Sequence, residues 1–194
     1  MATLKAPKGI GILAEDLSDV EVVEAILTKY SERNKFFIKK FVGNGCGKLK
    51  NKCSKWGQIL LARGCQHVVL LHDLDRENKG KLRAVLEHRL SPVVLPCSVI
   101  VIPVEELEAW LLSDEDAIKA AFSLKSTPKR YQNTEQVKSP KEELSRLVWS
   151  LGGKRYFNTV HNRRIAERVS LDNLRRCPSF RILDEYIQRN VFHS

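Results

Sequence analysis

Four short apolar segments, separated by segments of helical length, form the most restrictive pattern in this chain. The apolar segments have strand length and lie at residues 8–14, 36–42, 67–72 and 98–103. The segments between them have helical periodicity and lie at residues 19–30, 50–63 and 79–89. Strands joined through helices run parallel, and a parallel sheet is covered on both faces. The sequence therefore predicts an α/β fold, with a mostly parallel sheet of about four strands and helices on both faces.

The second half of the chain has a different pattern. A helix is predicted from Val104 to Ser113, followed by a polar segment at 124–139 that forms either a loop over the sheet rim or a mobile substrate-facing element. Three further helices are predicted at residues 140–151, 159–168 and 179–188. We therefore expect an α/β domain at 1–123 and, at 124–194, a loop and C-terminal helical extension packed on it.

The composition is typical of a water-soluble protein. Of the 194 residues 43% are hydrophobic, which is enough for an ordinary core, and no apolar run approaches the roughly 18 residues of a membrane span. The start of the chain has no apolar segment of the signal-peptide type. Five cysteines without close pairing favour reduced thiols over a disulfide framework. We expect a cytoplasmic protein with no membrane partner.

Acidic residues follow three of the predicted strands. They are Glu15 and Asp19 after the first, Asp73 and Asp75 after the third, and Glu106 and Glu108 after the fourth. Acids that follow buried parallel strands meet at one rim of the sheet, where carboxylates can converge on a hard cation. The pattern therefore predicts a Mg²⁺ (or Mn²⁺) site.

Two of the three acidic pairs also have a simpler interpretation. Asp73 and Asp75 could lie in a solvated turn, and either Ser18 or Asp19 could cap the following helix. Glu108 falls inside the apolar face of the helix predicted from Val104, and a buried carboxylate is costly unless a cation or hydrogen bonds compensate it. A metal ion or an arginine is expected to meet Glu108, with a metal as the preferred candidate.

The basic residues are unevenly distributed. The net charge is +10, and nine Lys or Arg residues lie between Arg33 and His72 without any acid. A basic surface around an acidic site favours nucleic acid as the partner, although the same charge could simply keep the protein soluble. The residues expected to contact phosphate are Lys48, Lys50, Lys52, Arg163 and Arg164.

Several common active sites are excluded by spacing. The segment GNGCGKLK is one residue too short for a phosphate loop, and Leu49 stands where Ser or Thr is required. The five histidines include no zinc-peptidase pair, and no local motif supports Cys–His catalysis.

The acidic motifs resemble the Toprim domain, the metal-binding module of topoisomerases, primases and OLD-type nucleases. More closely, the chain resembles a bacterial Toprim-like family of unknown function that is often encoded beside ABC-type ATPases in mobile or defence loci. The segments that carry this resemblance cover most of the chain and are AEDLSDVEVVEAIL, HDLDRE, VEELEAWLLSDEDAI, SPKEELSRL and HNRRIAERVSLDNLRRCPSF.

The resemblance implies roles for residues at matching positions. Glu15 stands at the Toprim glutamate, a general acid or base or a metal ligand, and Asp73 and Asp75 stand at the metal-binding pair. Further matching positions are Glu106 and Glu108 in an E-x-E motif, and the Asp114 that follows it. The chain departs from the pattern at Asp16, where the family usually has Gly, and at Asp19, where Glu is more usual. A Toprim-like (Rossmann-like) fold and an ATPase partner are also implied.

Three functions agree with these features. The leading hypothesis is a Mg²⁺-dependent nuclease that hydrolyses phosphodiesters of DNA or RNA, with one or two metal ions and Glu15 handling a proton. The second is a catalytically inactive subunit that binds nucleic acid or a protein partner, for which metal binding is the discriminating observation. The third is a phosphotransfer or nucleotide-processing enzyme on a similar sheet, which a screen of small nucleotides would distinguish.

Overall fold

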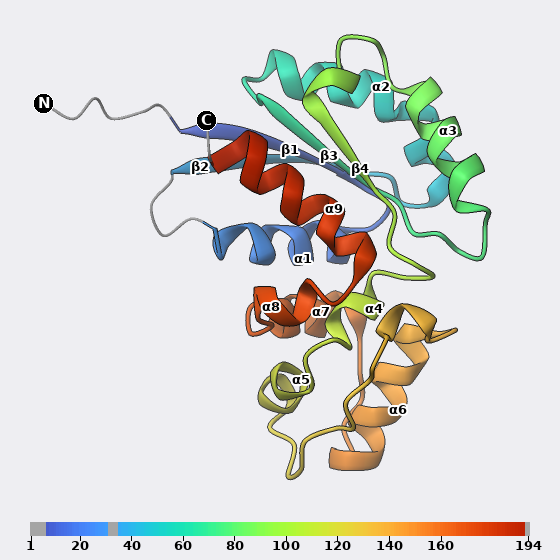
Figure 1. Ribbon diagram of the computed structural model, residues 1–194, viewed down its shortest axis with the longest axis vertical. Helices are drawn as coiled ribbons and strands as arrows, with labels where there is room; N and C mark the ends of the chain where they lie inside the picture. The colour runs from blue at the N-terminus through green and yellow to red at the C-terminus, as the bar shows by residue number, and fades with distance from the viewer. Residues whose placement is uncertain (1–6, 31–34, 193–194) are drawn as a thin grey trace, which may run out of the picture.

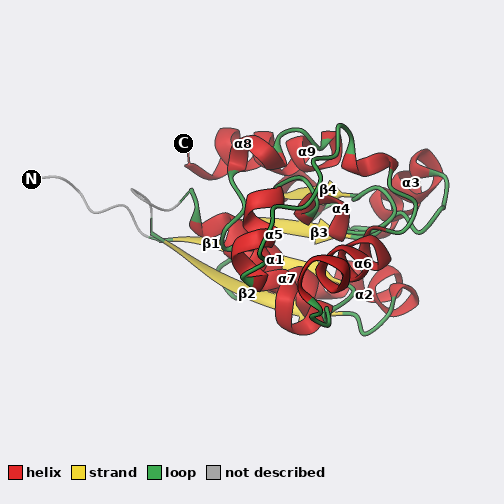
Figure 2. Ribbon diagram, turned by 90° about the horizontal axis from the view of Figure 1, so that it is seen from below, coloured by secondary structure: helices red, strands yellow, loops and turns green. Residues whose placement is uncertain are grey.

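A four-stranded, all-parallel sheet forms the centre of the molecule. The computed structural model describes residues 7–30 and 35–192. The strands are β1 (Lys8–Ala14), β2 (Phe36–Val42), β3 (His67–Leu71) and β4 (Ser98–Val101), in the order β2-β1-β3-β4. Figure 2 shows the strand arrows running in one direction. The predicted α/β class with a parallel sheet is confirmed.

Helices cover both faces of this sheet, as predicted. In Figure 1, α2 (Cys46–Ala62) and α3 (Lys79–Arg89) lie on one face, and α1 (Leu17–Thr28) and α9 (Pro178–Tyr186) lie on the other. Strand side chains alternate between two hydrophobic clusters, so Leu13 packs toward α2 while its neighbours Ile12 and Ala14 pack toward α1. This alternation determines, for each strand residue, whether its side chain packs toward α1 or toward α2.

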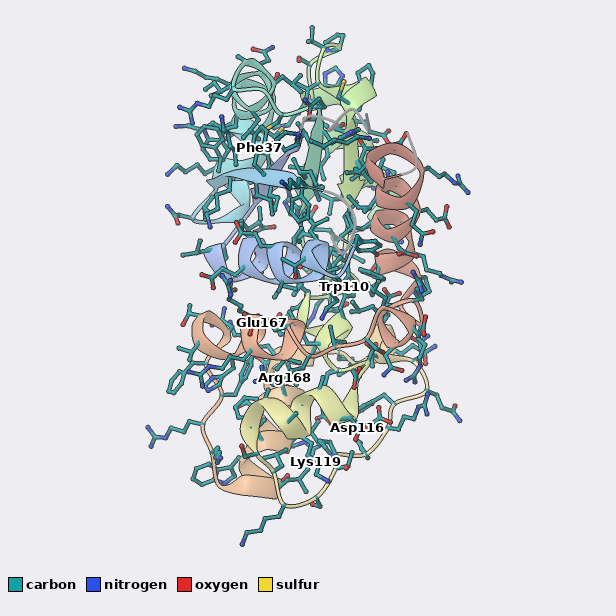
Figure 3. The ribbon with its side chains drawn as sticks, turned by 90° about the vertical axis from the view of Figure 1, so that its left-hand side faces the viewer. Phe37, Trp110, Asp116, Lys119, Glu167 and Arg168 are labelled. Atoms are coloured by element: carbon teal, nitrogen blue, oxygen red, sulfur yellow. The ribbon has the colours of Figure 1, made fainter. Side chains whose placement is uncertain are left out.

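The remaining helices form a layer beyond α1. They are α4 (Glu108–Leu111), α5 (Glu115–Phe122), α6 (Pro140–Gly152), α7 (Asn158–Ala166) and α8 (Leu171–Leu174). The shorter turns are 3₁₀ helices at Leu95–Cys97 and Thr134–Gln136 and a π-helical end at Ile187–Phe192. Figure 3 shows Trp110 between α1 and α9, with Asp116 and Lys119 on the outlying α5. Residues of this layer share one hydrophobic cluster with α1 and the sheet, so the C-terminal segment continues the main core.

Several predicted boundaries were wrong. The helix expected from Val104 to Ser113 is reduced to α4, because Glu105 has a left-handed φ of 60° that interrupts helical backbone before Leu107. Helix α2 begins earlier than expected, because Gly45, with φ of 120°, forms its N-cap and ends the glycine turn there. Helices α5 and α8 were not predicted, since both are short and α8 has only four residues.

The segment at 124–139 is a structured connection. It contains the turn Thr134–Gln136, and Glu135 Oε1 accepts a hydrogen bond from the backbone N–H of Ser179 at 2.9 Å. This contact ties the segment to the start of α9. Among the described residues, no helix is both long and apolar enough to cross a membrane.

A partly buried ion pair connects α9 to α8 and to the end of α1. Arg175 Nε donates to Asp184 Oδ2 at 2.9 Å, and the Tyr30 hydroxyl donates to Asp184 Oδ1. Burial alone would raise the pKa of Asp184, but the hydrogen bonds from Arg175 and Tyr30 outweigh burial and hold this pKa below its usual value.

We therefore expect Asp184→Asn to destabilise the protein by about 2 kcal/mol at neutral pH, since hydrogen bonds to charged groups contribute on that scale. A carboxyl with a lowered pKa stabilises the fold above its unfolded pKa of about 4, and this contribution is lost as pH falls through the folded value. Urea unfolding from pH 3 to pH 8 measures the free energy of unfolding of the variant and the wild type. The difference between the two should be constant above about pH 5 and should shrink in acid. A difference that is equal at every pH would contradict the assignment.

Candidate functional site: an acidic cavity at the carboxyl ends of the strands

A cavity of about 400 Å³ opens where the strands end. Its wall combines the β1–α1 junction, the turn before α2, the second residue after β3, and the starts of α4, α6 and α7. The lining residues are Glu15, Asp16, Leu17, Asp19, Asn44, Gly45, Asp73, Glu106, Glu108, Lys141 and Asn158. Five of the six predicted metal ligands therefore line one cavity, and the sixth, Asp75, does not.

Glu15 and Asp73 bring unpaired oxygens to this cavity. Glu15 Oε1 and Asp73 Oδ1 are buried and have no hydrogen-bond partner among the described residues. His72 Nδ1 lies 2.9 Å from Glu15 Oε1, but its N–H is better directed to the backbone carbonyl of Asp73 at 2.7 Å. Buried polar atoms without a partner are uncommon, and an unpaired carboxylate oxygen indicates a position for a cation.

The carboxylates of the cavity repel one another. Burial, followed by the charges of Asp16, Glu108 and Glu15, raises the pKa of Asp19 to about 8. Burial and the same kind of repulsion, with Asp19 as the largest contributor, raise the pKa of Asp73 well above its usual value. The cavity thus concentrates negative charge, and Lys141 is the one lysine or arginine among its lining residues.

Three of the acids have structural partners as well. The N-cap of α1 is Asp16, with Asp19 in the capping box, instead of the predicted Ser18 or Asp19. The extended backbone of Asp16, with φ of −133°, shows that this Asp needs no glycine-like conformation. Glu106 Oε2 accepts a hydrogen bond from the backbone N–H of Lys141 at 3.0 Å, at the start of α6.

Glu108 is buried, but neither an arginine nor a second charged group compensates it. The Tyr156 hydroxyl lies 3.1 Å from Glu108 Oε1, and Asn162 Nδ2 donates to the same oxygen at 3.0 Å. Tyr156 and Asn162 are also hydrogen-bonded to each other. Two neutral groups, instead of the alternative arginine, therefore hold one oxygen of Glu108. The side chain still lines the cavity, so a metal at Glu108 stays a prediction.

Asp75 lies in a second, adjacent cavity of about 320 Å³ that shares Glu106 with the first. The backbone there is strained, since Asp75, Arg76 and Glu105 all have positive φ and Asp75 N–H donates to the Glu105 carbonyl. Asp75 and Asp73 diverge because a left-handed residue breaks the two-residue period that would have kept them on one side.

Among the described residues, no group of three or more His, Cys, Asp or Glu side chains has the arrangement of a metal site. The donor chemistry nevertheless suits Mg²⁺ or Mn²⁺, because carboxylate oxygens are the ligands that these ions take. Glu15 and Asp73 carry unpaired oxygens, and Asp19 and Glu108 adjoin them closely enough to influence the pKa of Asp73. Side-chain rotation would be needed to bring three of them onto one ion.

The expected phosphate-binding residues do not form one surface. Lys48, Lys50 and Lys52 lie on the first turns of α2, and Lys50 is paired with Glu77 at 2.7 Å. Arg163 is on α7, where it is paired with Glu167 at 3.0 Å. Arg164 is exposed on the same helix.

Sequence reasoning missed Tyr156 and Asn162, the residues that position Glu108. A signal for Asn162 was present, since it shares a helical face with Ile165 and Ala166 and is fully buried. No comparable signal marked Tyr156. Asp114, which the resemblance singles out, caps α5 and accepts hydrogen bonds from the N–H groups of Ala117 and Ser170.

Fold and site together define an α/β protein with an acidic cavity at the carboxyl ends of a parallel sheet. The chain belongs to the family described as Domain of unknown function (DUF4276), whose model matches residues 14–187 and so includes every residue of the cavity. No curated protein and no solved structure matches the chain. The family match names no activity, and the resemblance to the Toprim domain stays a hypothesis.

Proposed function

We propose that this protein is a Mg²⁺- or Mn²⁺-dependent phosphodiesterase that acts on nucleic acid. The observation that carries the proposal is the convergence of Glu15, Asp19, Asp73 and Glu108 on one cavity in which two carboxylate oxygens are buried without partners. An anionic substrate would be repelled from this cavity, so a bound cation is required before phosphate can enter.

Each residue would contribute through its position. Asp73 and Asp19 would hold the cation, and Glu108 would join them with the oxygen that Tyr156 and Asn162 leave available. The ion, when bound, would neutralise charge on the scissile phosphate and lower the pKa of a water molecule. Glu15, with its Oε1 close to His72, would accept the proton of the attacking water.

One observation favours a second candidate, a catalytically inactive subunit that binds nucleic acid or a protein partner, such as the ATPase that the resemblance implies. The described acids form no ready metal site, and Glu106 and Asp19 both have helix-capping partners. Calorimetric titration with Mn²⁺ separates the candidates, because the phosphodiesterase must bind the ion in the cavity and a scaffold need not.

The direct test is a cleavage assay with single- and double-stranded DNA and RNA, small nucleotides, and Mg²⁺, Mn²⁺ or EDTA. We expect cleavage of at least one polymer, no cleavage in EDTA, and a loss of about 100-fold or more in Asp73→Asn, because several kcal/mol of charge stabilisation are lost at about 1.4 kcal/mol per tenfold.

The matched control is Asp116→Asn, which makes the same change at an exposed position on α5 and should cleave at the wild-type rate. Cleavage that persists in EDTA or in Asp73→Asn would overturn the proposal. Hydrolysis of small nucleotides alone would move the protein to the nucleotide-processing class.

A further inference from the structure

Helix α2 and the edge strand β2 present a continuous basic surface, which we call the α2 stripe and define by Lys39, Lys48, Lys52, Trp56 and Arg63. Lys48, Lys52 and Trp56 recur at helical spacing along α2 and Arg63 is its C-cap, and Lys39 joins them from β2. Lys48, Lys52 and Arg63 are exposed. Figure 3 labels Phe37 on the β2 edge, beside this helix.

Aromatic rings lie beside three of the four cations of the stripe. The Phe41 and Trp56 rings stack with centroids 5.4 Å apart and planes within 5°. The Lys52 ammonium lies 6.0 Å from the Trp56 ring, and the Arg63 guanidinium lies 5.6 Å from the Phe41 ring. Lys39 is placed in the same way over Phe37, at 5.4 Å. Cations that already lie on rings lose less side-chain entropy when they bind an anion.

Carboxylates are missing from this surface. The sequence from Arg33 to His72 contains no acid, and within 7–30 and 35–192 no carboxylate lies within 4.0 Å of a charged nitrogen of the stripe. Cations elsewhere are commonly paired, as Arg146 is with Glu143 and Arg175 with Asp184. Lysines on an edge strand can serve only to prevent edge-to-edge pairing, but that role does not explain the basic residues on α2.

The stripe starts at the acidic cavity. Asn44 and Gly45, which immediately precede α2, line the cavity, and α2 has neither a side-chain cap nor an acid in its first turn. The positive end of the helix therefore faces the cavity rim. From Lys48 to Arg63 the helix rises about 22 Å, which equals about six nucleotides of a stacked strand.

We propose that the α2 stripe binds the sugar–phosphate backbone of a nucleic-acid strand and leads that strand to the acidic cavity. Binding by the stripe does not require catalysis, whereas delivery to the cavity rests on the proposed phosphodiesterase function.

The test compares two variants that each lose three positive charges. In the stripe variant, Ala replaces Lys48, Lys52 and Arg63. In the control, Ala replaces three exposed residues away from the stripe: Lys125 after α5, Arg181 on α9 and Arg189 in the π-helical end. Binding of labelled 30-nucleotide single strands and duplexes is measured by fluorescence anisotropy in EDTA at 50–200 mM KCl. Thermal unfolding confirms that both variants are folded.

We expect the stripe variant to bind at least 10-fold more weakly at 100 mM KCl. Its slope of log affinity against log salt should be shallower by about 2–3, because each lost phosphate contact removes about 0.7–0.9 from the slope. The control should keep the wild-type slope. The proposal that the stripe binds nucleic acid would be overturned if the two variants had the same affinity and salt dependence, or if the wild type did not bind at 50 mM KCl.

Fluorescence supplies a second, local readout. A change in Trp emission on binding should persist in Trp149→Phe and disappear in Trp56→Phe; its persistence in Trp56→Phe would place the contact elsewhere. The two proposals fail separately. If the protein binds nucleic acid through the stripe but does not cleave it in Mn²⁺, the binding proposal stands and only the proposed activity is rejected. If the protein cleaves nucleic acid but both triple variants bind it equally, only the binding proposal is rejected.

Discussion

Replacing Asp19 and Asp73 together by Asn should raise the melting temperature of the metal-free protein and remove its response to Mn²⁺. In the wild type, saturation at 100 times the Kd contributes about 2.7 kcal/mol, a rise of about 5–10 °C for a chain of this size. The double variant relieves repulsion among buried carboxylates, and about 1 kcal/mol of relief corresponds to about 2–4 °C. Differential scanning fluorimetry with EDTA, Mg²⁺ and Mn²⁺ measures both effects.

The substitution Asp75→Asn tests which of the two cavities binds the metal ion. Because Asp75 lies in the adjacent cavity, its single substitution should preserve most of the rise in melting temperature with Mn²⁺. The control Asp116→Asn should change neither the metal-free melting temperature nor its rise with Mn²⁺. An intact metal response in the Asp19→Asn, Asp73→Asn variant would place metal binding elsewhere in the protein.

Trp110→Ala should be the most destabilising single substitution proposed here, with a loss of about 3–5 kcal/mol, typical of a truncated large core residue. Trp110 is fully buried, donates its indole N–H to Ser179 Oγ at 2.7 Å and meets the Phe180 ring edge-to-face at 5.3 Å. Because these contacts join α4 to α9, the melting temperature should fall by about 6–20 °C in one cooperative transition.

Trp149→Ala is the matched control, because Trp149 is 60% exposed on α6. Its substitution should change stability by less than about 0.5 kcal/mol. If Trp110→Ala instead produced two separate transitions, residues 124–194 would fold as a unit of their own, in conflict with the shared hydrophobic cluster.

Local patterns predicted most of the sheet. The strand Phe36–Val42 and the helix Lys79–Arg89 have the expected bounds, because apolar alternation and helical periodicity depend on near neighbours. Helix α4 is much shorter than the apolar pattern indicated, because a left-handed residue at Glu105 redirects the chain after β4. A contact with the β3–α3 loop helps to stabilise that conformation, since Asp75 N–H donates a hydrogen bond to the Glu105 carbonyl.

The sequence by itself determined which acids could meet. Acids that follow parallel strands emerge at one edge of the sheet, so Glu15 and Asp73 were placed together by connectivity alone. Only the tertiary structure decided the neighbours of each acid, because these come from segments distant in the chain. Asn162 donates a hydrogen bond to Glu108 across 54 positions, and Glu106 accepts one from the backbone N–H of Lys141 across 35. The Phe41 ring of β2 lies beside Arg63 at the end of α2. Such contacts depend on how helices pack on the sheet, and no local pattern of residues encodes that packing.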